Sequence, residues 1–451
     1  MALKHVAALL SLCASLRAGE TVLRVTDINP GAGGSYPSYL TLFNSQLYFR
    51  GHTGLQDTEL WRFDGTNASR AADIYPGLNG SSPSYLATLN GHLYFDASSP
   101  GVGYKLRRFD GANVSVVNVV PSAFFGSGAW NPVQWNNELW FLSSGRIQRF
   151  TGSTMSSLVN PPWANSEPVL FNGALYYSGQ ETTFGTELWR FNGSSLARVS
   201  DIHPGAADAY PDALFAHGAA LYFRARDATN GFELWRYDGV QAQLVADIFP
   251  GPGSSQPGGF ASFRAALYFS ADDGAQGYEL WRYDGTNATL AANVNTNAIY
   301  EEGGDRLSDS NPRRLTVWND ALYFIAENGA LTGLWRYDGT NAVLLGGGSP
   351  NGVTETIVFQ NALYFDADDG VWGRELWRVE TNPAPRISIA APAATVNMQL
   401  NQTETGRYVI EYTENLEQWF PLATNSPANG RILFQDSPNA RHRSYRVRRL
   451  P

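Results

Sequence analysis

Short apolar runs recur along the chain between turn-forming residues, a pattern that predicts many short β-strands. One run ends in Leu-Tyr-Phe or a close variant, and another reads Glu-Leu-Trp-Arg, then an aromatic residue, Asp and Gly. The tryptophan of the second run, or the residue in its place, recurs every 41–54 residues, at Trp61, Arg107, Gln148, Trp189, Trp235, Trp281, Trp335 and Trp377. A period of this size, with several strands in each unit, is typical of the blades of a β-propeller.

The unit at 257–294 shows how a blade is expected to form. Four segments read as strands, which we name a, b, c and d in chain order: Gly259–Phe263, Ala266–Ala271, Glu279–Tyr283 and Thr289–Val294. The a–b and c–d links are short and carry dipeptides such as Asn90-Gly91 and Asp284-Gly285, which supply the positive φ of tight hairpins. The longer b–c and d–a links are then expected to emerge together on the opposite face.

The number of strands favours a closed ring of eight blades. Eight a–b–c sets are present, but a d strand follows only the first seven. The segment Thr21–Ile28 resembles the d strand that ends in Asp73-Ile74, so it is expected to complete the last blade. The fold class is therefore all-β, an eight-bladed propeller closed by the N-terminal strand. Seven blades or an open array stay possible alternatives, because the third unit (131–159) is degenerate.

Composition changes along the chain divide it into segments. Residues 1–18 have the charge, apolar run and small residues of a signal peptide. The repeats fill 19–380, and a proline-containing linker follows at 381–386. Residues 387–451 are expected to form a small β-sandwich, with strands at Arg386–Ile389, Tyr408–Tyr412, Arg431–Phe434 and Tyr445–Arg448.

Charge and cysteine content narrow the classes of partner. The net charge is −9, which argues against nucleic acid as a partner. The only cysteine, Cys13, lies in the expected signal peptide, so the mature chain would have no disulfide or cysteine-bound metal. No run approaches the ~20 apolar residues of a membrane span. We expect a monomer that is secreted, extracellular or on the cell surface, with the periplasm as an alternative.

Three phrases that recur in order carry a resemblance to a known family: Glu-Leu-Trp-Arg-Phe-Asp-Gly-Thr at 59–66, Asp-Ile-Tyr-Pro-Gly at 73–77 and Leu-Tyr-Phe-Asp-Ala-Asp-Asp-Gly at 363–370. They resemble the ELWxxDGT, or hyalin-like, repeats of secreted bacterial proteins, over roughly 21–380. The tail, with Tyr408–Tyr412 and Asn415–Trp419, resembles a C-terminal module of Verrucomicrobia-type secreted proteins. The resemblance implies export and a propeller-like repeat, but no settled activity.

Residues that recur in every unit are expected to be structural. An arginine follows the tryptophan position in all eight units, whereas a single active site needs only one copy. We expect these arginines to bridge to carboxylates on neighbouring strands or turns, and the tryptophans to pack between blades.

Residues that break the repeat are the candidate binding residues. The longest insertion, 295–314, contributes Tyr300, Glu301, Glu302 and Asp305, and two irregular loops contribute Trp130 and Trp163. Exposed rings can stack on the apolar faces of sugars while acids accept hydrogen bonds from hydroxyls, so the sequence favours a glycan or protein ligand on the long-loop face. The alternative is that these rings fold down onto the propeller.

Catalytic and metal-binding interpretations have less support. A carbohydrate-active hydrolase or lyase could use acids of the 295–314 loop, although adjacent glutamates rarely converge on one bond. A purely structural surface protein is a further alternative. Asp366, Asp368 and Asp369 could hold Ca²⁺, but such residues more often build a turn through side-chain hydrogen bonds to the backbone. We expect no other cofactor.

Overall fold

The computed structural model of the chain describes two parts. In the first, the described residues are 20–30, 32–54, 57–77, 79–118, 132–158, 161–295, 298–301, 304–307, 309–329, 332–345, 353–368 and 370–381; in the second they are five strands between 396 and 449. Contacts between Cα atoms divide the chain into two compact units, one containing Val22–Glu380 and the other Thr381–Pro451. No described residue belongs to a helix long and apolar enough to cross a membrane.

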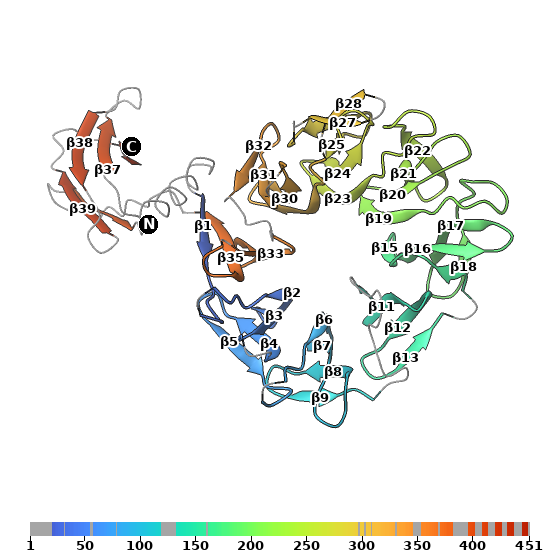
Figure 1. Cartoon of the computed structure of the whole chain (residues 1–451), viewed down its shortest axis with the longest axis horizontal. Coiled ribbons are helices and arrows are strands. Elements are labelled where there is room, and N and C mark those ends of the chain that lie inside the picture. The colour runs from blue at the N-terminus through green and yellow to red at the C-terminus, as the bar shows by residue number, and fades with distance from the viewer. Residues whose placement is uncertain are drawn as a thin grey trace. The chain divides into compact units, whose positions relative to one another are not determined.

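The first unit is a β-propeller of eight antiparallel blades arranged in a ring (Figure 1). Blade 1 contains β2 (Ser38–Phe43), β3 (Gln46–His52), β4 (Thr58–Phe63) and β5 (Ala68–Ala72). Blade 2 contains β6 (Ser84–Leu89), β7 (His92–Ala97), β8 (Lys105–Phe109) and β9 (Val114–Val116). Blade 3 contains β10 (Val133–Trp135), β11 (Glu138–Ser143), β12 (Arg146–Phe150) and β13 (Met155–Ser157). The degenerate third unit therefore still forms a complete blade.

Blade 4 has one more strand than its neighbours, because β14 and β15 both pair with β16. Blade 4 contains β14 (Trp163–Ala164), β15 (Val169–Phe171), β16 (Ala174–Glu181), β17 (Gly185–Phe191) and β18 (Leu196–Arg198). Blade 5 contains β19 (Asp212–His217), β20 (Ala220–Ala225), β21 (Glu233–Tyr237) and β22 (Ala242–Ala246). Blade 6 contains β23 (Gly258–Phe263), β24 (Ala266–Asp272), β25 (Tyr278–Tyr283) and β26 (Ala288–Ala292). The strands of blade 6 fall where the sequence predicts them, with β26 ending two residues early.

Blades 7 and 8 complete the ring. Blade 7 contains β29 (Arg313–Trp318), β30 (Ala321–Glu327), β31 (Thr332–Tyr337) and β32 (Ala342–Leu345). Blade 8 contains β33 (Thr356–Phe359), β34 (Ala362–Asp368), β35 (Arg374–Thr381) and, from the other end of the chain, β1 (Glu20–Arg24). The backbone N–H of Val25 donates to the carbonyl of Leu376 over 2.9 Å, which extends the pairing beyond β1. The prediction of eight blades closed by the N-terminal strand is confirmed.

Tight turns form where the predicted dipeptides lie. In the c–d turn of blade 1, the Asp64 carboxylate accepts hydrogen bonds from the backbone N–H groups of Thr66 and Asn67, each over 2.7 Å, and Gly65 takes a φ of +105°. Asn90 and Gly91 have φ values of +47° and +73° in an a–b turn. The short turns therefore gather on one face of the propeller, and the b–c and d–a connections emerge on the other.

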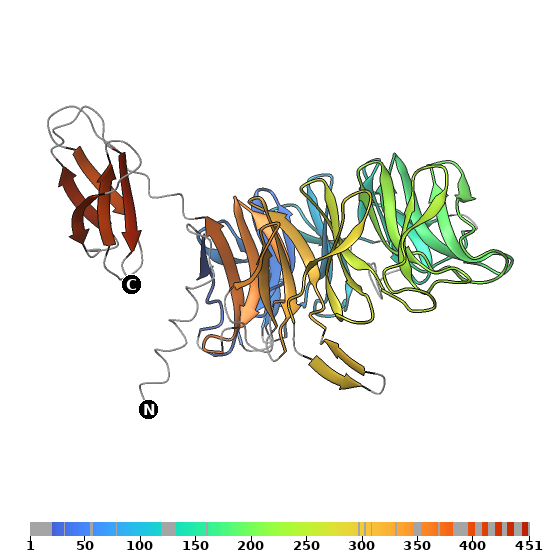
Figure 2. The ribbon, with the colours of Figure 1, turned by 90° about the horizontal axis from the view of Figure 1, so that it is seen from above.

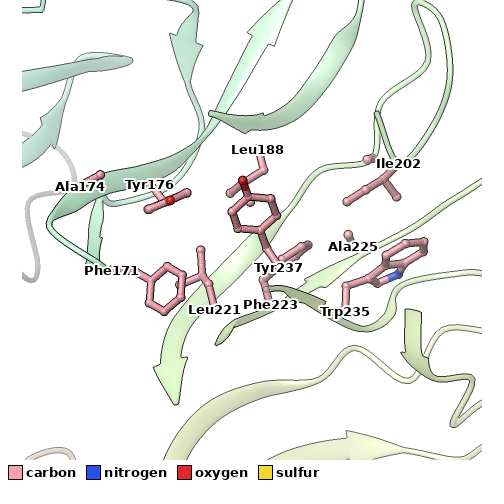
Figure 3. Close-up of a cluster of buried hydrophobic side chains, with 11 residues drawn as sticks. Phe171, Ala174, Tyr176, Leu188, Ile202, Leu221, Phe223, Ala225, Trp235 and Tyr237 are labelled. Atoms are coloured by element: carbon pink, nitrogen blue, oxygen red, sulfur yellow. The ribbon is translucent and has the colours of Figure 1, made fainter. Parts of the chain in front are cut away.

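The core lies between blades. Figure 3 shows the cluster between blades 4 and 5, which contains Trp235 and Tyr237 of β21 together with Tyr176 and Leu188 of blade 4. The ring centroids of Tyr237 and Tyr176 lie 5.7 Å apart. Trp281 and Trp335 occupy corresponding clusters between blades 5 and 6 and between blades 6 and 7. The prediction that the tryptophans pack between blades is confirmed at these positions.

The arginines that follow the tryptophan position bind in two ways. Arg149, Arg282, Arg336 and Arg378 form ion pairs with carboxylates of their own blades, as the sequence predicts. By contrast, Arg62 and Arg236 donate to neutral side chains of strand d, Ser69 and Gln243. At these two positions a hydrogen bond to an uncharged polar side chain of strand d takes the place of the expected carboxylate bridge.

The second unit contains two small antiparallel sheets. One pairs β36 (Val396–Asn401) with β39 (Arg431–Asp436), and the other has β37 (Tyr408–Thr413) between β38 (Phe420–Asn425) and β40 (Ser444–Arg449). Three of the four predicted strands are found there, and the fourth prediction, Arg386–Ile389, lies outside the described residues. β36 and β38 are strands that the sequence analysis does not predict.

Candidate functional site

A buried glutamate holds each of several d–a connections in place. The Glu59 carboxylate accepts hydrogen bonds from the backbone N–H groups of Ile74, Tyr75 and Ser81, and from the Ser81 hydroxyl over 2.6 Å. Four equivalent glutamates are also fully buried: Glu187, Glu233, Glu279 and Glu375. The sequence analysis missed this role, although a glutamate before Leu-Trp in strand c recurs in five units.

Burial changes the acidity of these glutamates. Desolvation raises the pKa of Glu279 to about 7, although hydrogen bonds donated by Ser310, Val294 and Asn295 act in the opposite direction. The pKa values of the other four glutamates are raised for the same first reason. Because the same contact recurs around the ring, these carboxyl groups order the long-loop face and do not mark a single catalytic centre.

All exposed aromatic side chains among the described residues lie on the long-loop face. They occupy b–c or d–a connections: Tyr36, Tyr104, Trp163, Phe184, Tyr210 and Trp372. The large hydrophobic side chains exposed elsewhere, such as Val240 and Leu290, are all aliphatic. Aromatic exposure is therefore confined to one face, although the repeat distributes aromatic residues along every blade.

Cationic or heteroaromatic side chains support several of these rings from one side. The Arg24 guanidinium lies 4.2 Å from the ring centroid of Trp372, and that of Arg198 lies 4.0 Å from Phe184. The Tyr36 ring stacks on His52 with centroids 5.2 Å apart. Such contacts are worth about 0.5–1 kcal/mol at exposed sites, so they favour a defined orientation of each ring.

Trp163 is the predicted site residue that the structure describes most fully. It lies in β14, in the d–a connection before blade 4, and its side chain is 55% exposed. Its indole packs over Gly145, where a Cβ atom would come within 2.1 Å of the ring. This tryptophan therefore lies flat on the b–c turn of blade 3, with the rest of its surface accessible.

The long insertion before blade 7 contains a two-stranded hairpin that projects from the blades (Figure 2). Tyr300 and Glu301 lie in β27 (Ala298–Glu301), and Asp305 lies in β28 (Gly304–Leu307), opposite Tyr300. The other two predicted residues, Trp130 and Glu302, lie outside the described residues. The hairpin and Trp163 belong to different blades, so the fold does not gather the predicted residues within a single blade.

A cavity of about 400 Å³ lies among the innermost strands, next to the axis of the ring. Its lining comes from blades 1, 2, 3, 7 and 8 and includes Tyr39, Tyr85, Gln134, Arg314, Glu355 and Thr356. The rings of Tyr39 and Tyr85 are 5.5 Å apart. Sequence analysis missed this cavity because its residues come from segments up to about 300 positions apart.

The predicted calcium ligands have other partners. Asp366 is fully buried, forms an ion pair with Arg374 and accepts hydrogen bonds from the backbone N–H groups of Thr354 and Glu355. Asp368 accepts a hydrogen bond from Gly370 N–H within its own turn, and Asp369 lies outside the described residues. These contacts fit the turn-building interpretation, and a calcium site here stays a prediction.

Another acidic group, Asp57, Glu59 and Asp73, brings three carboxylate oxygens within 4.8 Å of one another. Arg70 forms ion pairs with both aspartates, and Glu59 binds the d–a connection. The charge of this group is therefore already partly compensated by the protein itself.

No family model and no curated protein matches the sequence. Among solved structures, the chain is similar to the β-propeller domain of the trilobed protease from Pyrococcus furiosus, with 10% identity, a TM-score of 0.41, and coverage of 69% of this chain and 98% of that one. It is also similar to prolyl oligopeptidase B from Galerina marginata (11% identity, TM-score 0.44, 86% and 54% coverage) and to oligopeptidase B from Leishmania major (10%, 0.42, 76% and 54%). The chain thus spans about half the length of these two oligopeptidases, and at such identities the likeness concerns the fold alone.

Proposed function

We propose that this protein is a secreted or cell-surface recognition propeller that binds a glycan or a protein through its long-loop face. The observation that carries the proposal is the confinement of all exposed aromatic side chains of the described residues to that face. Aromatic rings combine a large apolar surface with few rotatable bonds, and they are enriched in binding surfaces for this reason. A rigid ring of blades holds the connections that carry them.

The supporting contacts add to this proposal. Rings that already lie against Arg24, Arg198 or His52 lose less side-chain entropy when a ligand covers them. Export is part of the proposal and follows from the resemblance of the repeats and of residues 1–18 to those of secreted proteins. Nothing in the described residues favours the hydrolase or the purely structural alternative over recognition.

A binding screen with a matched surface control tests the proposal. Wild type would be compared on a glycan array, and in pull-downs from defined protein mixtures, with a variant carrying Tyr104→Ala, Trp163→Ala and Trp372→Ala. The control carries Val240→Ala and Leu290→Ala, which remove exposed apolar side chains away from this face. We expect ligand binding to fall at least about tenfold in the aromatic variant and to stay unchanged in the control. Equal binding by both variants would contradict the proposal.

A further inference from the structure

The cavity near the ring axis contains three large side chains at strained backbone positions. Tyr39, Tyr85 and Arg314 have φ values of +59°, +57° and +55°, in the left-handed region that large residues rarely occupy. Each lies within the irregular register at the start of its innermost strand, β2, β6 or β29. The fold therefore requires a left-handed residue at this position of the blade, whatever its side chain.

Other blades meet the same requirement with small residues. The corresponding irregularities of β19 and β23 contain Ala213 and Gly259, with φ values of +53° and +65°. Glycine adopts this conformation without steric penalty, and for other residues an unfavourable backbone region costs of order 1–3 kcal/mol. Tyr39, Tyr85 and Arg314 all line the cavity, so the chain retains large polar side chains there despite the strain.

Contacts between blades make the cavity wall rigid. The Glu355 carboxylate accepts hydrogen bonds from the backbone N–H groups of Tyr39, over 3.0 Å, and Leu40, over 2.9 Å, which joins blade 8 to blade 1. The hydroxyl groups of Thr316 and Thr356 lie 2.7 Å apart and join blade 7 to blade 8. A ligand would thus meet a largely preformed site.

The cavity wall contains one acidic side chain, Glu355, and one basic side chain, Arg314. The Glu355 oxygens already accept two backbone hydrogen bonds, whereas the Arg314 side chain is exposed and forms no ion pair with any described carboxylate. A guanidinium matches a carboxylate through two parallel hydrogen bonds. The net charge of −9 disfavours long polyanions, so one carboxylate on a short ligand fits best.

We propose that this cavity binds a short acidic saccharide whose single carboxylate pairs with Arg314 and whose ring packs against Tyr39 and Tyr85. The side chains of Gln134 and Thr356 supply amide and hydroxyl partners for sugar hydroxyls. A volume of about 400 Å³ accommodates one or two sugar rings. None of the six exposed rings of the long-loop face lines the cavity, so this site is separate from the surface invoked in the proposed function.

Calorimetric titration of the full chain tests the inference. The probes are a disaccharide with one galacturonate unit, the same disaccharide with its carboxyl group reduced to an alcohol, and a tripeptide with a free C-terminal carboxylate. We expect the acidic sugar to bind at least about tenfold more tightly than the reduced sugar, with an affinity that weakens as salt is added.

The variants are chosen to keep the left-handed backbone. Arg314→Asn removes the guanidinium but tolerates positive φ, and it is expected to lower the affinity for the acidic sugar about tenfold or more. Arg314→Lys keeps the charge and should retain part of the binding, which separates loss of charge from loss of folding. The control, Arg313→Asn, removes a neighbouring arginine that pairs with Glu327 and does not line the cavity, and it should bind like wild type.

Several results would overturn the inference: equal binding of the acidic and reduced sugars, no binding of either, unchanged affinity in Arg314→Asn, or binding of the tripeptide alone. The surface variant with Tyr104→Ala, Trp163→Ala and Trp372→Ala distinguishes the two proposals. It should leave the acidic disaccharide bound at the axis while lowering binding to the long-loop face.

Discussion

The buried glutamates are the residues on which the long loops depend most directly. Each accepts several hydrogen bonds from a connection that would otherwise leave backbone N–H groups without a partner inside the fold. The aspartates of the short turns show the opposite pKa shift to the buried glutamates. Backbone N–H donors lower the pKa values of Asp64, Asp238 and Asp284. Two kinds of carboxyl group therefore give the propeller opposing pH dependences.

The first prediction concerns Glu279. Its pKa is raised by burial to about 7, so the folded protein holds this proton more tightly than the unfolded chain does. The resulting stabilisation is fully present below about pH 4.5 and is lost as the pH rises through 7. Relative to Glu279→Gln, wild type should therefore lose unfolding free energy between pH 4.5 and 7.5, as measured by urea denaturation.

The comparison with Glu279→Gln isolates the effect of Glu279 from that of other groups that titrate in the same pH range. Burial lowers the pKa values of His52 and His217, and these histidines favour the fold at higher pH in both proteins. Glu327→Gln, which removes a surface carboxylate paired with Arg313, controls for the loss of one charge. A difference between wild type and Glu279→Gln that stays constant over this pH range would contradict the prediction.

At the scale of the blade, the aromatic residue in strand c joins neighbouring sheets. Trp235 is paired with Phe223 across β20 and β21, and it contacts Ile202 of the preceding d–a connection. Trp235→Ala would leave a cavity between blades 4 and 5 and should lower the unfolding free energy by about 3–5 kcal/mol. Urea denaturation measures this, and an unchanged midpoint would refute the packing role. Val240→Ala, at a side chain 85% exposed in the same blade, should change stability by less than about 0.5 kcal/mol.

Elements with a strong local pattern could be predicted, and elements defined by their neighbours could not. The b and c strands of blade 6 follow from Leu267-Tyr268-Phe269 and from Glu279–Tyr283, because these are short, aromatic-rich runs between turn residues, and they are buried along most of their length. β14 has only two residues and exists because it pairs with the end of β16. β38 begins with Phe420-Pro421, and a proline removes a backbone donor from the ladder, which obscures the strand pattern.

The candidate site shows the same limit. Breaks in a repeat are visible along the chain, so the sequence could point to the irregular loop that carries Trp163, whose side chain is exposed. Sequence reasoning could not identify the axial cavity, because Tyr39, Tyr85 and Arg314 become neighbours only when the ring closes. The three residues do share a sequence pattern, because each follows a proline by two positions, in Pro-Ser-Tyr, Pro-Ser-Tyr and Pro-Arg-Arg. All three have a left-handed backbone, so this pattern marks their common place in the blade.

At the scale of the whole molecule, the two ends of the repeat region are joined by one strand. β1 covers the outer edge of β35, and Val25 and Ile28 pack against the cluster between blades 8 and 1. Thr26 strengthens the junction, because its hydroxyl donates to Glu375 over 2.8 Å and accepts from the Leu376 N–H over 3.0 Å. Closure thus depends on both backbone pairing and a buried polar contact.

The polar contact can be removed alone. Thr26→Val keeps the shape of the side chain but leaves Glu375 and the Leu376 N–H each without one buried partner, and this should lower the unfolding free energy by about 1–3 kcal/mol. Chemical denaturation provides the measurement. Thr41→Val offers a matched control, because its hydroxyl donates only to backbone carbonyls, over 3.0 and 3.4 Å, at the inner strand β2 and away from the junction. Equal effects of the two substitutions would show that the junction has no special role.

Removal of residues 20–28 tests closure itself. Without β1, the backbone groups of β35 lose their ladder partners and the cluster containing Leu376 loses Val25 and Ile28, so we expect a lower melting temperature and association through the exposed edge. Size-exclusion chromatography with light scattering would detect the association. A shortened chain lacking 382–451, which leaves all eight blades intact, should melt like wild type and stay unassociated. If loss of 20–28 changed neither property, the ring would be held by contacts between blades alone, and β1 would be dispensable.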